Sequence, residues 1–370
     1  MHQALEYSQN ENFQNYIKMR ISPDSLLAID MVKRMKSEKI VAVVAMIVLV
    51  GFSALCAWYL TGLPKMSSGA SEQITIGIMP IESHALIYVA EDKGFFSENG
   101  LDVTIRDYNT GPAAIQGLLD NEVDISGSGE YVVVRSAFNK KNINIIASID
   151  NYQVFYLAGR KDRGIENILD LKGKKIGVTQ GSQAEFFLGR FLNLRGIRLQ
   201  DITRIDVQTS QSVNAITNGS VDAVIYSRQY NDTIKDRLGD NGVFWPAQSS
   251  QLLYSVMASR NDWIASHPGT INRFLKSLVQ AEEYTAKHPA EAKAIIQKRL
   301  NYKDAYMETV WSEHQFSLSL EQSLILMMED EARWMIKNNL TSEKKTPDFL
   351  KYIYFDGLIT IKPESVNIIR

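Results

Sequence analysis

Five short polar segments carry the side chains that could hold a small molecule, and each follows a predicted strand. They span residues 80–84, 109–111, 127–130, 179–183 and 226–228. In open parallel sheets, ligands bind beyond the carboxyl ends of the strands, where helix N-termini also lie. The five segments are therefore predicted to meet in one site for a small polar ligand.

The most informative segment is VTQGSQAEFFL (178–188), which predicts a strand, a tight glycine turn and a helix. Gly181 would let the backbone come close to a ligand, and the first free N–H groups of the helix carry partial positive charge. Ser182 could cap the helix or donate to an anion, with Thr179 and Gln183 beside it. An ordinary N-cap without a ligand explains the same residues equally well.

Other candidates occupy the equivalent positions after the remaining strands. In TGP (110–112), a capping residue precedes a proline near the first helical position, a common arrangement that also occurs without a ligand. A helix start or wall packing would account for His84 and Tyr226 as readily as ligand contact. The uncharged candidates outside 179–183 are His84, Thr110, Gly111, Ser128, Gly129 and Tyr226.

Glu130 and Arg228 are the charged residues that a neutral cleft would not need. Together they could bind the two ends of a zwitterion, the amine at Glu130 and the acid at Arg228 and the Gly181 amide. The alternative is that Glu130 complements a helix dipole while Arg228 is solvated or forms an ion pair across the cleft.

No motif indicates an enzyme or a cofactor. The sequence lacks a G-x-S-x-G elbow, a phosphate loop and an HExxH metal motif, and its one cysteine, Cys56, lies in an apolar run. We therefore expect no catalytic residue, no metal and no cofactor. With 40 basic and 42 acidic residues, the net charge of −2 also gives no reason to expect nucleic-acid binding.

The elements that must position these residues form an α/β pattern. Short β-branched runs alternate with helical stretches in two units, which predicts parallel sheets with helices on both faces. The expected strands are 74–79, 101–106, 124–126 and 143–148 in the first unit, and 174–179, 204–207 and 223–226 in the second. Residues 263–338 are predicted to be helical throughout, with breaks near Pro268, Pro289 and Asn301.

This helical run suits a chain that returns to its first lobe. We expect lobe 1 at about 74–156 and 252–370, and lobe 2 at about 157–251. The segments 154–158 and 252–258 would be the two crossings between them.

An apolar segment precedes this region. Residues 40–60 contain no charge, and a helix of that length spans roughly 30 Å, the thickness of a bilayer core. Four basic residues lie within 33–39, which places the N-terminus inside the cell. The segment could be a transmembrane anchor over 40–62, a cleaved signal, or a lipidation site at Cys56. We expect a cytoplasmic tail at 1–39, a linker at 63–73 and a solute-binding domain at 74–370, outside the cytoplasmic membrane.

Several runs resemble a known family. They are ALIYVAEDKGFFSENGLDVTI (85–105), NEVDISGSGE (121–130), DLKGKKIGVTQGSQAEFFL (170–188) and NGSVDAVIYS (218–227), with DEARWMIKNNL (330–340) and the C-terminal residues. These are similar to bacterial substrate-binding proteins for aliphatic sulfonates, taurine, nitrate and thiamine pyrimidine precursors. The similarity covers about residues 73–370. Relatives often carry an aromatic residue and a proline where this chain has 226–228, so the resemblance does not specify the ligand.

The resemblance implies a type II periplasmic-binding-protein fold, with two lobes that close on a ligand about a hinge. It also implies delivery of that ligand to the permease and ATPase subunits of an ABC transporter. In the family, the turns matching Gly181 and Ser182, and the loops matching Thr110–Gly111 and Ser128–Gly129, contact the ligand. Two alternatives share the fold: a sensory ectodomain for a membrane signalling partner, and a pyrimidine-precursor synthase. The synthases carry a cysteine-rich motif that this chain lacks.

Overall fold

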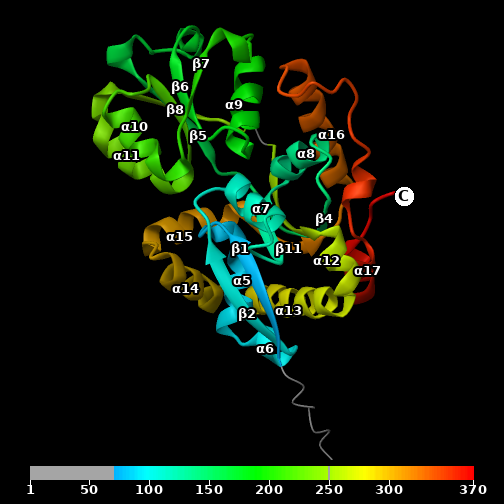
Figure 1. Ribbon diagram of the computed structural model, residues 1–370. Coiled ribbons are helices and arrows are strands. Elements are labelled where there is room, and N and C mark those ends of the chain that lie inside the picture. Colours follow the sequence, from blue (N-terminus) through cyan, green and yellow to red (C-terminus); the bar gives the residue numbers. More distant parts are fainter. Residues whose placement is uncertain (1–70, 249–250) are drawn as a thin grey trace, which may run out of the picture. The chain divides into compact units, whose positions relative to one another are not determined.

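The computed structural model describes residues 71–248 and 251–370, which form two β-sheets with helices packed against them (Figure 1). The strands are β1 (Glu72–Ile78), β2 (Leu101–Asp107), β3 (Ile125–Gly129), β4 (Ile143–Tyr152), β5 (Phe155–Arg160), β6 (Lys175–Val178), β7 (Thr203–Asp206), β8 (Ala223–Ser227), β9 (Gly242–Pro246), β10 (Leu253–Arg260) and β11 (His314–Ser319). The first sheet has the order β11-β4-β10-β3-β1-β2, and the second has the order β7-β6-β8-β5-β9. The predicted α/β class is confirmed.

The helices connect the strands and cover the sheets. They are α5 (Ala85–Asp92), α6 (Phe95–Glu98), α7 (Gly111–Leu119), α8 (Glu130–Phe138), α9 (Gln183–Asn193), α10 (Ser212–Thr217), α11 (Asn231–Leu238), α12 (Asn261–Ser266), α13 (Pro268–Lys287), α14 (Pro289–Leu300), α15 (Asp304–Val310), α16 (Gln322–Lys337) and α17 (Asp356–Ile361). Short 3-10 turns join several of them.

Both sheets are mixed, and this corrects the prediction of parallel sheets. Strands connected through helices do run parallel: β1 pairs in this way with β2 and β3, and β6 with β7 and β8. However, β10 is antiparallel to β3 and β4, and β5 is antiparallel to β8 and β9. Both β5 and β10 directly follow a strand of the other sheet. A parallel strand needs a crossover, usually a helix, that returns the chain to the starting edge of its sheet, and within the described residues no helix precedes either strand in this way.

The chain passes between the sheets twice, after Tyr152 and after Pro246. The segments 154–158 and 252–258, expected to be the crossings, lie mostly within β5 and β10. The first sheet draws its strands from 72–152 and 253–319, and the second draws them from 155–246. That these two parts are lobes that move relative to each other stays a prediction.

The buried side chain of Gln248 ties the two passages together. Its Oε1 accepts hydrogen bonds from the backbone N–H groups of Val154 and Phe155, the second at 2.8 Å. Its Nε2 donates to the carbonyl oxygens of Tyr152, at 3.3 Å, and Gln251, at 2.9 Å. One amide therefore satisfies backbone groups of both passages.

Replacing Gln248 with alanine is expected to lower the free energy of unfolding by at least about 2 kcal/mol, because each buried N–H left without an acceptor costs about 1–3 kcal/mol. Urea unfolding of Gln248→Ala measures the loss. Gln208→Ala, at an exposed position, is the control and should leave stability unchanged. A Gln248→Ala variant as stable as this control would show that the amide does not join the passages in solution.

The helical C-terminal region is interrupted by a strand that the sequence analysis missed. The breaks predicted near Pro268, Pro289 and Asn301 are confirmed, since α13 and α14 begin at the two prolines and Asn301 ends α14 with φ of 54°. Residues 314–319 (HQFSLS) nevertheless form β11, which pairs antiparallel with β4. The prediction that 263–338 is helical apart from those breaks was therefore wrong at this strand; the alternation of apolar and polar residues in QFSLS is typical of a strand.

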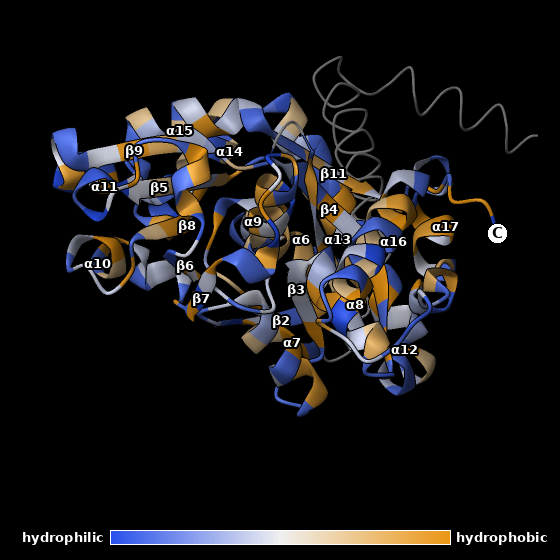
Figure 2. Cartoon of the chain, turned by 90° about the horizontal axis from the view of Figure 1, so that it is seen from above, coloured by the Kyte–Doolittle hydropathy of each residue, from blue (hydrophilic) through white to orange (hydrophobic). Residues whose placement is uncertain are grey.

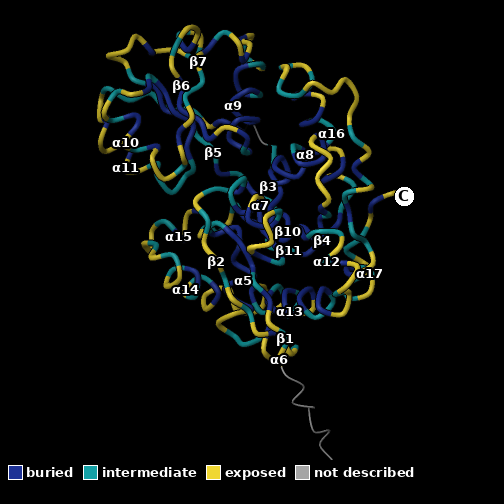
Figure 3. The backbone as a smooth tube through the Cα atoms, in the orientation of Figure 1, coloured by how far each residue is buried: buried dark blue, intermediate teal, exposed yellow. Residues whose placement is uncertain are grey.

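Helix amphipathicity explains how these elements pack. In α13 the buried residues recur every three or four positions, as in Ile271, Phe274, Leu275 and Leu278. Hydrophobic and hydrophilic residues accordingly alternate along the helices (Figure 2), and inner strands such as β4 and β10 are mostly buried (Figure 3). Burial of these apolar faces holds the helices on the sheets.

No helix within 71–248 and 251–370 is long and apolar enough to cross a membrane. The predicted tail at 1–39, the apolar segment at 40–62 and most of the linker at 63–73 lie outside the described residues. The last two residues of that linker already belong to β1.

Candidate ligand-binding site

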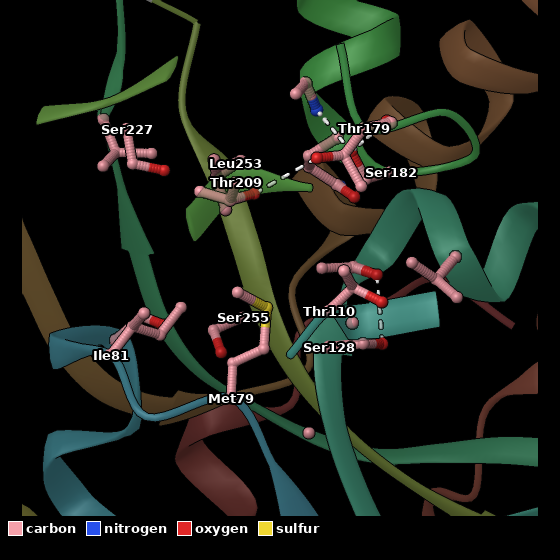
Figure 4. Close-up of a pocket in the computed structure, with 18 of the residues that line it drawn as sticks. Met79, Ile81, Thr110, Ser128, Thr179, Ser182, Thr209, Ser227, Leu253 and Ser255 are labelled. Atoms are coloured by element: carbon pink, nitrogen blue, oxygen red, sulfur yellow. Dashed lines mark hydrogen bonds between the residues drawn. The ribbon is translucent and has the colours of Figure 1, made fainter. Parts of the chain in front are cut away.

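A cavity that is partly open to solvent lies where the ends of several strands of both sheets, and the loops that follow them, meet. Figure 4 shows Thr110, after β2, and Ser128, near the end of β3, on one side, and Thr179 and Thr209, after β6 and β7, on the other. The hydroxyl groups of Thr179 and Thr209 are 3.2 Å apart. The arrangement agrees with the rule that sites form beyond the carboxyl ends of strands.

Eight of the twelve predicted site residues line this cavity. They are His84, Thr110, Gly111, Ser128, Gly129, Thr179, Ser182 and Gln183. Ser227 of the fifth predicted segment lines the cavity as well, so the structure brings all five segments together. That these residues bind a ligand stays a prediction.

The other four predicted residues do not line the cavity. The guanidinium group of Arg228 pairs with Glu313, and the carboxyl group of Glu130 is fully buried behind the wall. The Gly181 amide donates to the Glu185 carboxylate at 2.9 Å. Tyr226 packs in a separate apolar cluster and its hydroxyl is 3.0 Å from Asn231.

The zwitterion hypothesis therefore does not fit this structure. It requires Glu130 and Arg228 to face one ligand, and neither charge faces the cavity. The alternative proposed for Arg228, an ion pair across the cleft, is the arrangement seen here.

Two helix N-termini at the cavity, those of α7 and α9, are capped by side chains of the chain itself. At α9, Ser182 accepts from the Ala184 N–H at 3.2 Å and donates to the Thr179 carbonyl at 2.7 Å. Gly181 has φ of 75°, a left-handed conformation that glycine adopts without strain. At α7, Thr110 accepts from the Ala113 N–H at 3.2 Å, and Pro112 has no N–H to offer.

The sequence analysis missed a buried polar cluster at the base of the cavity. Glu82 lines the wall and accepts hydrogen bonds from the hydroxyls of Tyr306, at 2.6 Å, and Tyr302, at 2.9 Å. The His314 imidazole lies 3.9 Å from Glu82 and is bonded to Asp150 on its other side. Burial opposes protonation of His314, but the Asp150 carboxylate outweighs it and raises the pKa of the imidazole.

The sequence could have indicated Glu82 as a site residue, but not the two tyrosines that donate hydrogen bonds to it. It lies in segment 80–84, after the first strand, but the charge was not singled out. The tyrosines are more than 200 residues away in the chain, and no local pattern links them to the site. No local pattern indicated four further wall residues either, which lie at the ends of β4, β5 and β10 next to the passages: Tyr152, Phe155, Leu253 and Ser255.

His84 is held as a neutral imidazole. It is 1% exposed, and burial lowers its pKa to about 4, with a small opposing effect of the Met79 carbonyl. A Cβ atom on Gly127 would lie 2.5 Å from His84 Nε2, so only glycine allows the ring to pack there. His84 therefore contributes shape and polarity to the wall, without charge.

Behind the cavity, Gln183 bridges two buried carboxyl groups. Its Nε2 donates to Glu130 and lies 3.4 Å from Glu331. Burial raises the pKa of Glu130 to about 8 and raises that of Glu331 well above its ordinary value. At neutral pH Glu130 is therefore mostly protonated and adds little charge to the site, and burial disfavours the charged form of Glu331 in the same way.

Comparison with known proteins identifies the family. The model described as NMT1/THI5 like matches residues 81–292. A putative binding protein of Brucella abortus is 27% identical over 262 residues, which cover 68% of this chain and 78% of that protein. A putative aliphatic sulfonates-binding protein of Bacillus subtilis is 29% identical over 234 residues, covering 60% of this chain and 68% of that protein.

A solved structure gives the fold. The alkanesulfonate-binding protein SsuA from Xanthomonas axonopodis pv. citri, bound to MOPS, aligns with a TM-score of 0.67 at 16% identity, covering 78% of this chain and 99% of that chain. This likeness shows the α/β fold of periplasmic binding proteins, as the resemblance implied. Because the family match spans more than half of the sequence, the chain belongs to the NMT1/THI5-like family.

Proposed function

We propose that this protein is a solute-binding protein, which captures a small polar molecule in the cavity and delivers it to an ABC permease outside the cytoplasmic membrane. The observation that carries the proposal is the cavity itself, formed by loops of both sheets and lined by hydroxyl and amide side chains. The names of the Brucella and Bacillus relatives, both binding proteins, support it. The apolar segment at 40–60 supports attachment to the membrane.

The eight predicted residues in the wall are proposed to contact the ligand, together with Glu82. Hydroxyl groups can donate or accept, so Thr110, Ser128, Thr179 and Ser182 suit a ligand with several polar atoms. Closure of the two parts on the ligand would bury it further. Tyr302 and Gln229, from the two sides, are already 2.9 Å apart.

Binding is expected to raise the melting temperature of the purified protein. At a ligand concentration of 100 Kd, one site stabilises the fold by about 2.7 kcal/mol, which corresponds to a shift of several degrees. The panel comprises sulfonates, nitrate, amino acids, pyrimidines, purines and amides. Ser227→Phe, which puts a ring into the half-buried rim of the cavity, should abolish the shift.

Ser210→Phe is the matched control, because Ser210 is exposed and outside the cavity wall. This variant should keep the full shift. A folded wild-type protein that no panel member stabilises would count against solute binding. Conversion of a bound compound into a product would favour the synthase alternative.

The sensory alternative rests on the apolar segment, which an anchored receptor would retain. Transport and sensing differ in what the bound protein contacts. Ligand-dependent co-purification of permease and ATPase subunits from native membranes supports transport. Co-purification of a signalling kinase or cyclase without them supports sensing.

A further inference from the structure

The wall of the cavity contains no lysine or arginine side chain within the described residues. Guanidinium groups nearby are directed elsewhere: Arg228 pairs with Glu313 and Arg204 pairs with Glu185. Arg135 lies against the Gly181 turn and does not reach the wall. A bound anion would therefore meet no cationic side chain.

Helix N-termini are the other usual source of positive potential, and at α7 and α9 the chain's own side chains bind some of these N–H groups. At α9 the Glu185 carboxylate accepts a hydrogen bond from the Gly181 N–H, and the Ser182 hydroxyl accepts one from the Ala184 N–H. At α7 the Thr110 hydroxyl accepts a hydrogen bond from the Ala113 N–H, and Pro112 has no N–H. The N-terminus of α8, which follows Gly129 of the cavity wall, has no side-chain cap. The carboxyl group of its first residue, Glu130, accepts the Tyr254 N–H at 3.0 Å.

The fixed charge at the base of the cavity is not positive. Glu82 and Asp150 place two carboxyl groups around the single imidazole of His314. Even with that imidazole protonated, the cluster has no excess of positive charge. An anion would therefore be repelled by Glu82 rather than neutralised.

The remaining wall suits an uncharged molecule. Apolar side chains from both parts of the protein (Ile81, Val132, Phe155 and Leu253) form surfaces for a hydrophobic body. Hydroxyls alternate with them and can exchange donor and acceptor roles. Such a site is typical of pockets in which a few polar groups fix the orientation of a mostly apolar ligand.

We infer that the cavity selects an uncharged polar molecule and rejects sulfonates, nitrate and amino-acid zwitterions. The inference rests on the proposed function, since it specifies the ligand class of the same site. It separates this chain from its relatives that are named for sulfonates, although the fold is shared.

Calorimetry and thermal shift on the purified full-length chain in detergent test this inference with probes that differ in charge. The anionic and zwitterionic probes are ethanesulfonate, nitrate, nicotinate and alanine; the uncharged ones are ethanesulfonamide, nicotinamide, cytosine, uracil and adenine. Only uncharged probes are expected to raise the melting temperature, and each shift should disappear in Ser227→Phe. The Kd of a bound probe should change less than twofold between 0.05 and 0.5 M NaCl, because no ion pair is formed.

Three outcomes are possible. The inference is supported if only uncharged probes bind at the cavity and their Kd is insensitive to salt. An anionic or zwitterionic probe whose binding is lost in Ser227→Phe overturns it and leaves the proposed function intact. Failure of every probe and of the wider panel overturns the proposed function, and this inference with it.

Discussion

Raising the pH from 6.5 to 9 is expected to lower the free energy of unfolding of the wild-type protein, and the double variant Glu130→Gln, Glu331→Gln should show a smaller dependence. His314, whose pKa is also raised, adds a loss in the same direction that both proteins share. Both carboxyl groups are 0% exposed and share the amide of Gln183. Burial is the main reason that their pKa values are raised, to about 8 for Glu130; for Glu331 the charge of Glu130 adds to it.

The direction follows from the protons bound by each state. In the unfolded chain both groups ionise near their ordinary pKa of 4.5. In the folded protein the pKa of Glu130 is about 8, and that of Glu331 is also raised well above 4.5. The stability that the two protonated carboxyl groups contribute is fully present below pH 4.5. It is lost between pH 4.5, the unfolded pKa, and the raised pKa of the folded state. Within that window, each group reduces the free energy of unfolding by about 1.4 kcal/mol per pH unit.

Urea unfolding at pH 6.5, 7.5 and 9 measures this slope. The lower limit avoids His84, whose lowered pKa acts in the opposite direction between about 4 and 6.5. Glu343→Gln removes an exposed carboxylate and is the control, with a slope like that of the wild type. Equal slopes in the wild type and the double variant would mean that the two carboxyl groups are ionised in the folded protein.

The sequence predicted the parts of the site that lie next to each other in the chain. A strand followed by a glycine turn and a capping serine or threonine is a local pattern, and it located Thr110, Ser128, Thr179 and Ser182 in the cavity wall. It could not show which amides were free. Glu185 of α9 accepts a hydrogen bond from the Gly181 N–H and forms an ion pair with Arg204 of β7. Only the folded chain brings Glu185 and Arg204 together.

Charge was the feature least accessible from sequence. Glu130 and Arg228 occupy the positions where binding residues occur, yet one is buried behind the wall and the other pairs with Glu313, 85 residues later. The fold shows the same contrast. Strands joined by helices run parallel as predicted, whereas the orientations of β5 and β10 depend on passages between sheets that no local pattern encodes.

Replacing Gly189 with alanine is expected to destabilise the protein by about 1–3 kcal/mol, the usual cost of overpacking a buried contact. Gly189 lies on α9, beside the second sheet, and faces Trp334 of α16, which packs by the first sheet. A Cβ atom at Gly189 would be 2.2 Å from Trp334 Cζ2. The indole has little room to move, because Phe186 and Tyr131 pack against it with ring centroids 5.3 and 6.0 Å away.

The control is a glycine in another helix with open space around it. A Cβ atom at Gly269 of α13 would meet nothing within 4 Å, so Gly269→Ala should be neutral or raise stability by up to about 1 kcal/mol through helix propensity. Urea unfolding should therefore show a loss of stability in Gly189→Ala and no loss in Gly269→Ala. If Gly189→Ala is instead as stable as Gly269→Ala, α9 and α16 are not in contact in solution. The cavity beside them would then be more open than the structure has it, and ligand would be needed to close it.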